Sequence, residues 1–504
     1  MTPLQHPRSV SAATSAGKLG VPQLVSFILA SATLLTVVTA VYPTGIAVTG
    51  LINFTAGFAV VGVVLMLWAP GYVKMGRHVP NAGAFYAYSA TGLNKPLGVG
   101  AAWMALASYC LLQVGLYGVT GTAAAPLMRE LGWNPPWWLL AGGAAVLVGG
   151  LGLTQIKISG RLLAVLLLAE VAFILVVAVA GPLHPSDNGM ALEVLDVRQL
   201  FAGSAAGATC ALVLLGYVGV EQGAVLVEDA RRPHWTVGLA TYGGILAAAV
   251  LYVLSTWSQA ATIGTAHLVD SARQHGPDMY WLVVNVTLGP VAVLIGRVLF
   301  LTSVNAATLS FHQAFARYAF SAGRDGVVPR WVAYSSRRTG APVAGSLIQT
   351  VIGLTVITVY AIADLDPLVH LFYFGGTVGG VGILLLITLT SIAIVFFLAR
   401  CQGARAVVLP LVAALILLAM TYAVLTNLDL LLGVDPDSPL LIAVPAMFGA
   451  LMVAGVVRAL YLRCVRPGTY AGIGQGVRSV LAELPDDPDP RALTAPVVLD
   501  GSSR

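Results

Sequence analysis

The run Gly216-Tyr217-Val218-Gly219-Val220-Glu221 lies in the middle of a long apolar segment, which ends in the polar stretch at 228–233. Lipid offers no hydrogen-bond partner to freed backbone groups. Two glycines and a carboxylate are therefore tolerated at this depth only where the backbone lines a cavity inside the protein. We predict a membrane helix that is interrupted near Gly219. Its half-helix ends would face a solute site, as they do in secondary transporters.

The composition of the chain supports a membrane protein. Hydrophobic residues make up 58% of the 504 residues and charged residues only 9%, whereas the surface of a soluble domain is roughly a quarter to a third charged. An apolar stretch of about 20 residues crosses the ~30 Å hydrocarbon core of a bilayer. We predict an all-α integral membrane protein with twelve transmembrane helices, at residues 23–42, 46–70, 98–127, 137–155, 158–181, 200–227, 236–262, 280–310, 342–362, 368–398, 406–431 and 439–463.

The positions of the basic residues test this span count independently. If residue 1 is cytoplasmic, 22 of the 26 lysines and arginines fall on the cytoplasmic side, three fall in outer loops and one falls inside the membrane. Basic residues concentrate on the inner face, and a wrong span count would destroy this alternation. We therefore expect a multi-pass protein of the cytoplasmic membrane with both termini inside.

Three regions are expected along the chain. Residues 1–20 form a short polar arm, residues 21–463 form the transmembrane domain, and residues 464–504 form a polar, proline-containing tail predicted to be disordered. The first span shows no small-residue cleavage site followed by a soluble domain, so we do not interpret it as a signal peptide.

Four short motifs accompany this layout. They comprise 80–86 after the second span, 219–221 within the sixth, 228–233 just after it, and 317–342 after the eighth. In this order, and on the expected side of the membrane, they resemble those of the amino acid–polyamine–organocation family of permeases. The resemblance covers about residues 20–463.

The resemblance implies a five-plus-five inverted repeat, as in leucine-type sodium-coupled carriers. Repeat one would span about 23–181 and repeat two about 200–398, with two peripheral helices at about 406–463. Spans 1 and 6 would be broken at the membrane midplane. The family pattern places glycines at the break in span 1, but residues 30–39 of this chain contain none. Hydroxyl side chains can re-satisfy freed backbone groups, so the hydroxyls of Ser31, Thr33, Thr36 and Thr39 would permit a break here.

A bound amino acid would place its carboxylate on amide groups of the span 1 break and its ammonium on carbonyls of the span 6 break, as helix-end electrostatics favours. In span 3, Tyr109, Gln113 and Tyr117 are spaced by four residues and therefore share one helix face. This face either lines the cavity or packs against neighbouring helices. The candidate substrate-binding residues are Ser31, Thr33, Thr36, Tyr109, Gln113, Tyr217, Val218, Gly219 and Glu221.

Glu170, Glu221 and Arg297 are ionisable residues inside predicted spans. Each would cost about 2.5–3.5 kcal/mol if unpaired. Either Arg297 forms a structural ion pair with one glutamate, or the remaining glutamate titrates and couples transport to protons. In relatives within the family that the chain resembles, a lysine often stands where Glu170 does, and its ammonium takes the place of the sodium ion bound by sodium-coupled carriers. The charge at this position is reversed in this chain. We therefore hypothesise that Glu170, beside Thr302 and Ser303, holds a proton or a sodium ion.

These observations favour a secondary active transporter of an amino acid or related amine. Proton-coupled symport is the main hypothesis. An exchanger, an exporter, or a polyamine or ethanolamine-type permease of the same fold remain alternatives, and a membrane enzyme is disfavoured because the inner loops hold few, separated acids. The expected partners are the small-molecule substrate and the lipid bilayer. No cofactor beyond H⁺ or Na⁺, no metal, no nucleotide and no nucleic acid is expected, since the chain has neither a phosphate-binding loop nor a basic folded domain.

Overall fold

The structure, a computed structural model, describes residues 19–475 except 155, 187–188, 203–204 and 337–338. The described part is helical, and its one β-type contact is an isolated bridge between Leu19 and Ala230. The α-helices are α2 Val21–Ser31, α3 Leu34–Thr36, α4 Tyr42–Thr49, α5 Phe54–His78, α6 Ala84–Gly92, α7 Lys95–Glu130, α8 Trp137–Gly152, α9 Ile156–Ala180, α10 Val197–Leu200, α11 Ala206–Gly216, α12 Pro233–Ile263, α13 Leu268–His275, α14 Met279–Leu288, α15 Pro290–Arg324, α16 Val343–Ile362, α17 Phe374–Gln402, α18 Val408–Thr426, α19 Leu428–Leu432, α20 Leu440–Val465 and α21 Pro467–Gly472. The π-helices are η1 Val37–Val41 and η8 Pro367–Tyr373, and the 3₁₀ turns are η2 Gly181–Leu183, η3 Leu192–Leu195, η4 Val220–Ala224, η5 Val227–Asp229, η6 Gly276–Asp278, η7 Arg330–Ala333 and η9 Ala404–Ala406.

Ten helices in the described part of the chain are long and apolar enough to cross a membrane, so this is a multi-pass membrane protein. The predicted spans at 137–155 and 200–227 correspond to shorter helices, α8 with 16 residues and α11 with 11. At 1.5 Å per residue, neither helix alone reaches ~30 Å. In the second case the α-helix stops at Gly216, inside the apolar segment.

The predicted boundary between the first two spans is wrong. The first helical segment continues through α4 to Thr49, and the second, α5, covers Phe54–His78 rather than 46–70. The α-helix stops where Gly50 adopts φ 69°, a left-handed conformation typical of helix ends. Pro70 lies inside α5 without ending it, and Arg77 and His78 belong to the last turn of this helix.

The prediction of a single span at 280–310 is also wrong. Gly289, at φ 82°, separates α14 from α15, and Pro290 begins the new helix. α15 then continues to Arg324, because the apolar pattern persists well beyond the predicted end.

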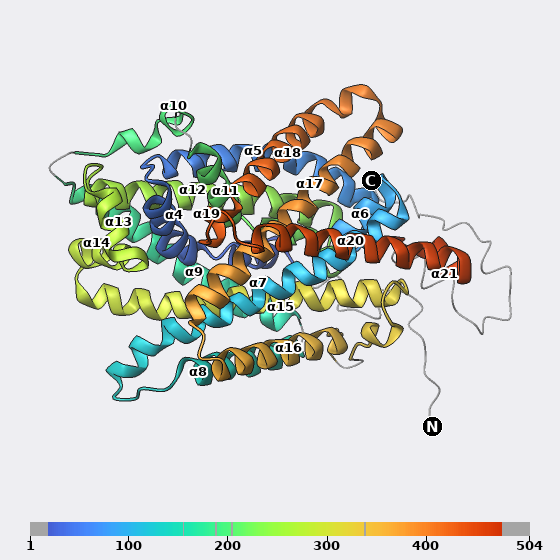
Figure 1. The fold of residues 1–504 in the computed structure, drawn as a ribbon, viewed down its shortest axis with the longest axis horizontal. Helices are drawn as coiled ribbons and strands as arrows, with labels where there is room; N and C mark the ends of the chain where they lie inside the picture. The colour runs from blue at the N-terminus through green and yellow to red at the C-terminus, as the bar shows by residue number, and fades with distance from the viewer. Residues whose placement is uncertain (1–18, 155, 187–188, 203–204, 337–338, 476–504) are drawn as a thin grey trace.

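The long helix α7 organises one side of the molecule, since it packs against α6, α8, α15, α17 and α20. On the other side α12 packs against α2, α5 and α9, and α2 reaches α15 as well. Figure 1 shows most helices running along the long axis of the molecule, with α8 and α16 side by side below α15. The interrupted helices α2–α4 and α11 lie inside this arrangement.

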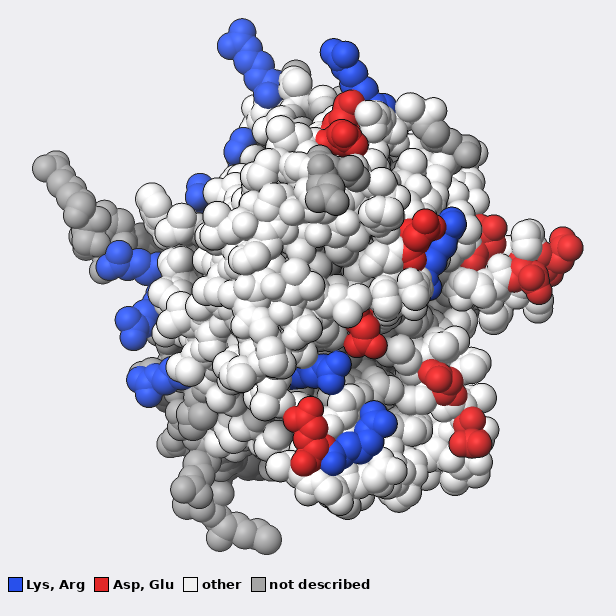
Figure 2. Space-filling view, turned by 90° about the vertical axis from the view of Figure 1, so that its left-hand side faces the viewer, with Lys and Arg blue, Asp and Glu red and all other residues white. Residues whose placement is uncertain are grey.

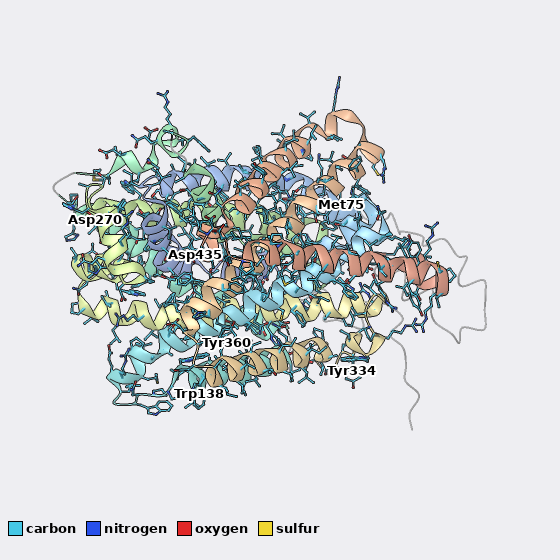
Figure 3. The ribbon with its side chains drawn as sticks, in the orientation of Figure 1. Met75, Trp138, Asp270, Tyr334, Tyr360 and Asp435 are labelled. Carbon is cyan, nitrogen blue, oxygen red and sulfur yellow. The ribbon has the colours of Figure 1, made fainter. Side chains whose placement is uncertain are left out.

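The two ends of the bundle differ. We call the end that carries α6 and α21 the tail end, and the opposite end, with α13 and α14, the far end (Figure 1). Exposed aromatic side chains mark both: Trp138 and Tyr334 lie near opposite ends of the α8–α16 layer (Figure 3). Such side chains concentrate at membrane–water interfaces. Figure 2 looks onto the far end, where charged side chains are scattered over a broad uncharged surface.

The predicted terminal regions are partly revised. Residues 1–18 and 476–504 lie outside the described residues. The first part of the predicted disordered tail is structured: α20 ends at Val465, α21 follows, and Ile473 is buried with 2% exposure. An apolar side chain that packs in this way gains enough burial to order a short polar segment.

Candidate functional site

The first interruption lies between α2 and α3, although it contains no glycine. α2 ends at Ser31, and Thr33 adopts φ 48°. This left-handed region is costly for a β-branched residue and persists only where its surroundings enforce it. Ser31 Oγ lies 2.8 Å from Phe27 O and 2.9 Å from Ile28 O, so its hydroxyl donates to carbonyls of the last turn. A hydroxyl side chain therefore supports the break.

The second interruption follows Gly216, where α11 ends. Gly219 has φ 114°, and a Cβ placed on it would lie 2.5 Å from the carbonyl carbon of Ser31. Ser31 Oγ is also 3.1 Å from Gly219 O. Only glycine permits this approach of two backbones. The two interruptions are therefore in direct contact.

Two hydroxyl groups from neighbouring helices hold carbonyls of the interrupted segments. Tyr252 OH, on α12, lies 2.6 Å from Ala32 O and 3.0 Å from Gly216 O. Ser310 Oγ, on α15, lies 3.0 Å from Phe27 O. These bonds supply the donors that lipid cannot offer.

Glu221 is fully buried and caps the second interruption. Its Oε2 accepts a hydrogen bond from Gly219 N at 2.7 Å, and its Oε1 accepts one from Tyr109 OH at 3.1 Å. Tyr72 OH donates to the Glu221 carbonyl at 2.9 Å. The side chain of Glu221 thus faces its own backbone and α7.

Glu170, on α9, caps the other break. Its Oε1 accepts hydrogen bonds from Leu35 N at 2.9 Å and from Ser303 Oγ at 2.7 Å, and the residue is 3% exposed. The expected neighbourhood of Glu170 and Ser303 is present. Thr302 instead donates to Leu299 O in its own helix at 2.8 Å. Glu170 therefore links α9 and α15 to the start of α3.

The expected ion pair of Arg297 with a buried glutamate is wrong. Arg297 pairs with Asp278 at 3.8 Å, and its side chain is 32% exposed. Because α15 begins at Pro290, Arg297 lies about 10 Å along the helix from its start. The new helix start places it near the far end rather than deep in the bundle.

Gln113 and Tyr217, two predicted binding residues, do not line the cavity described below. Gln113 Nε2 lies 2.8 Å from Tyr117 OH and 3.0 Å from His312 Nδ1, and Tyr217 OH donates to Phe58 O at 2.7 Å. His312, on α15, is fully buried. It belongs to a polar cluster between helices.

A cavity of about 140 Å³ lies against the first interruption. Four of the predicted binding residues line it: Ser31, Thr33, Thr36 and Val218. Thr36 is 2% exposed, and its hydroxyl has no hydrogen-bond partner among the described residues. A buried hydroxyl without a partner marks a place where a bound molecule can complete the hydrogen bonding.

The cavity extends to the far end. Its lining includes Val48 and Leu430, which are 43% and 40% exposed. Thr44 and Tyr373 also line it, with their hydroxyl oxygens 3.2 Å apart. This bond joins α4 to η8 across the mouth. α4 follows the π-helix η1 and η8 is itself a π-helix, a type of turn that is frequent at functional sites.

The tail end is closed by buried charges. Arg317 pairs with Asp229 at 2.6 Å, and Arg324 pairs with Glu228 at 3.1 Å. All four side chains are at most 6% exposed. These pairs join α15 to the segment that follows the second interruption.

Tyr86, on α6, extends this closure to the tail. Its hydroxyl donates to Asp325 Oδ2 at 2.7 Å and accepts from Gly474 N at 2.7 Å. Burial, and then the charge of Asp325, raise the pKa of Tyr86 well above its ordinary value, so the hydroxyl keeps its proton. Lys95 Nζ donates to Ala471 O at 2.7 Å.

Sequence reasoning missed Tyr252, Ser310 and the ion pairs at the tail end as parts of one site. A tyrosine in an apolar span needs a polar partner, which is a usable signal. That signal does not say which carbonyl the hydroxyl meets.

The family model described as "Amino acid permease" matches residues 19–452. The chain is 21% identical over 281 residues to the low-affinity putrescine importer PlaP of Escherichia coli strain K12, and equally to that of E. coli O157:H7. These alignments cover 53% of this chain and 58% of the relatives, so the chain spans less than two thirds of their length. Because the family match covers both interrupted helices and most of the spans, this multi-pass membrane protein belongs to the amino acid permease family.

Proposed function

We propose that this protein is a secondary active transporter that moves an amino acid or related amine across the cytoplasmic membrane by alternating access. The observation that carries the proposal is the contact of two interrupted helices, at Ser31 and Gly219, beside a cavity. Interrupted helices place half-helix ends at a solute site near the membrane midplane.

The proposed architecture has twelve spans. α2–α9 form the first five-span repeat, α11–α17 the inverted second repeat, and α18 and α20 the peripheral pair. The corresponding positions of the two interruptions, in the first helical segment of each repeat, support this arrangement. In this proposal α8 and α11 are completed as spans by the irregular segments next to them.

In the proposed orientation the tail end is cytoplasmic. The bias of 22 basic residues toward that side supports it. The cavity then opens outward while the ion pairs of Arg317 and Arg324 close the cytoplasmic side. Transport requires these pairs to separate and the mouth at Thr44 and Tyr373 to close.

We assign the coupling role to Glu170 and take the proton as the coupling ion. Glu170 accepts hydrogen bonds from Leu35 N and from Ser303. A change in its charge therefore alters the stability of the break in the first helix. Sodium is the alternative ion, since a carboxylate and a hydroxyl are oxygen ligands.

The test is uptake by the purified protein in liposomes, with an inward proton gradient, a sodium gradient or no gradient. Accumulation of an amino acid above equilibrium under the proton gradient supports the proposal. Exchange without net accumulation would identify an exchanger. Absence of flux for every amino acid and amine would refute it.

An amine without a carboxylate is the second candidate, favoured by the name of the putrescine importers. Ethanolamine-type amines fall in the same class. Competition tests whether the two candidates share one site. If they do, an excess of unlabelled putrescine must block uptake of a labelled amino acid.

A further inference from the structure

The cavity has a polar floor, a polar mouth and an apolar wall between them. Thr33 and Thr36 lie at the floor, and Thr44 and Tyr373 at the mouth. Every lining residue is described, and none carries a charge. The wall is formed by Val37, Val41, Leu112, Leu116, Leu215 and Phe311.

The buried carboxylates of this region are not part of the lining. Both oxygens of Glu221 accept hydrogen bonds from protein donors, Gly219 N and Tyr109 OH. Glu170 accepts from Leu35 N and Ser303 Oγ. A ligand in the cavity thus meets hydroxyl and backbone groups at the floor and hydrocarbon along the wall.

We propose that the substrate is a neutral α-amino acid with an aliphatic or aromatic side chain, whose head lies at the floor and whose side chain lies along this wall. The inference rests on the proposed function. A zwitterion carries no net charge, so its two charged groups can be satisfied by oppositely polarised helix ends without an ionised side chain. Its side chain gains free energy by leaving water for the wall.

The same wall disfavours a second cationic group. The distal ammonium of lysine, or of a diamine such as putrescine, would be desolvated against leucine and valine with no counter-charge among the lining residues. An unpaired ammonium in such surroundings is strongly unfavourable. The proposal therefore separates this chain in substrate class from the relatives named as putrescine importers.

Gly376 allows a direct test of the wall. It lines the cavity, and a Cβ on it would meet no atom within 4 Å. The substitution Gly376→Leu therefore fills cavity space without a clash at its first atom. Gly143, on α8, has equally open surroundings, is exposed, and does not line the cavity, so Gly143→Leu is the matched control.

The experiment measures the dissociation constants of alanine, leucine, phenylalanine, lysine and putrescine for the purified full chain and both variants. Leucine and phenylalanine are expected to bind more tightly than alanine, with lysine and putrescine at least about tenfold weaker than leucine. Gly376→Leu is expected to weaken leucine binding about tenfold or more and alanine binding much less, the discrimination that a change in an apolar pocket supplies. Gly143→Leu is expected to change neither.

Tighter binding of lysine or putrescine than of leucine overturns the inference and leaves transport of amino compounds standing. Equal weakening of alanine and leucine by Gly376→Leu overturns the assignment of the wall. Absence of binding by all five ligands overturns the proposed function as well.

Discussion

At the residue scale, Thr36 joins the cavity to the first interruption. Its side chain is 2% exposed, and its hydroxyl has no partner in the described part of the chain. An unsatisfied buried hydroxyl costs about 1–3 kcal/mol, which a bound substrate would recover. In the proposed site, Thr36 would thus contribute to affinity at a cost in stability to the empty protein.

Replacing Thr36 by valine keeps the shape and removes the hydroxyl. We expect the dissociation constant of the substrate to rise about tenfold, the loss of one hydrogen bond to a charged group, without a lower thermal midpoint. Titration and a melting curve measure both. Thr39→Val is the control, because Thr39 already donates to Leu35 O at 2.6 Å and does not line the cavity. Equal loss of affinity in both variants would contradict a direct contact.

Gly219→Ala is expected to abolish the folded state or transport. Its Cβ would lie 2.5 Å from backbone atoms of Ser31, and φ 114° adds strain of about 1–3 kcal/mol. Gly143→Ala, in open space on α8 and away from the cavity, is expected to retain both fold and uptake. Monodispersity in detergent and uptake in liposomes check the pair. A well-folded, active Gly219→Ala protein would show that the backbones separate without cost.

Glu170→Gln keeps the size of the side chain and an oxygen that can accept from Leu35 N and Ser303 Oγ. It cannot bind a coupling proton. We expect accumulation driven by a proton gradient to be lost while counterflow exchange continues. Unchanged accumulation in liposomes would rule out Glu170 as the coupling residue.

At the element scale, α12 stabilises both interruptions through one side chain. Tyr252 OH reaches Ala32 O and Gly216 O, which follow α2 and end α11, respectively. The two interrupted helices are therefore held by a third element as well as by each other.

Tyr252→Phe removes this hydroxyl and leaves the ring. We expect a loss of about 1–3 kcal/mol, the cost of leaving buried carbonyls short of a donor, and a lower thermal midpoint. Tyr88→Phe is a control, because Tyr88, on α6, is also fully buried and its hydroxyl has no partner among the described residues. A smaller effect of Tyr252→Phe than of the control would contradict the role given to α12.

At the scale of the whole molecule, one end is closed by ion pairs and the other is open to the cavity. Breaking a buried pair by removing one partner costs about 3–5 kcal/mol, since it leaves a charge uncompensated. In the proposed alternating-access cycle, the Arg317–Asp229 pair would therefore bias the equilibrium between the two access states.

Asp229→Asn is expected to shift this equilibrium away from the conformation described here. A cysteine at Thr377, which lines the cavity, reports the shift in a background without the four native cysteines. An impermeant thiol reagent added at the far end should label Thr377→Cys several-fold more slowly when Asp229→Asn is present. Equal labelling rates would show that the pair does not control access.

The sequence by itself determined the class of the molecule and the approximate position of its breaks. A composition with 58% hydrophobic residues and Gly219 near Glu221 in an apolar segment suffices for an interrupted membrane helix, because hydrocarbon leaves backbone groups few ways to be satisfied. Span ends were less predictable: apolar composition continues through Pro70, while Gly50 and Gly289 set the helix ends through backbone conformation.

Only the tertiary structure decided how the breaks are held. Thr33 adopts a left-handed conformation without glycine because Glu170 and Tyr252, from α9 and α12, bind backbone groups around it. The tertiary structure likewise pairs Arg297 with Asp278, and it leaves the Thr36 hydroxyl beside the cavity without a partner among the described residues. A hydrogen bond depends on atoms brought to within about 3 Å of each other. Sequence indicates that a buried polar group needs a partner, and the packing of distant helices chooses which one.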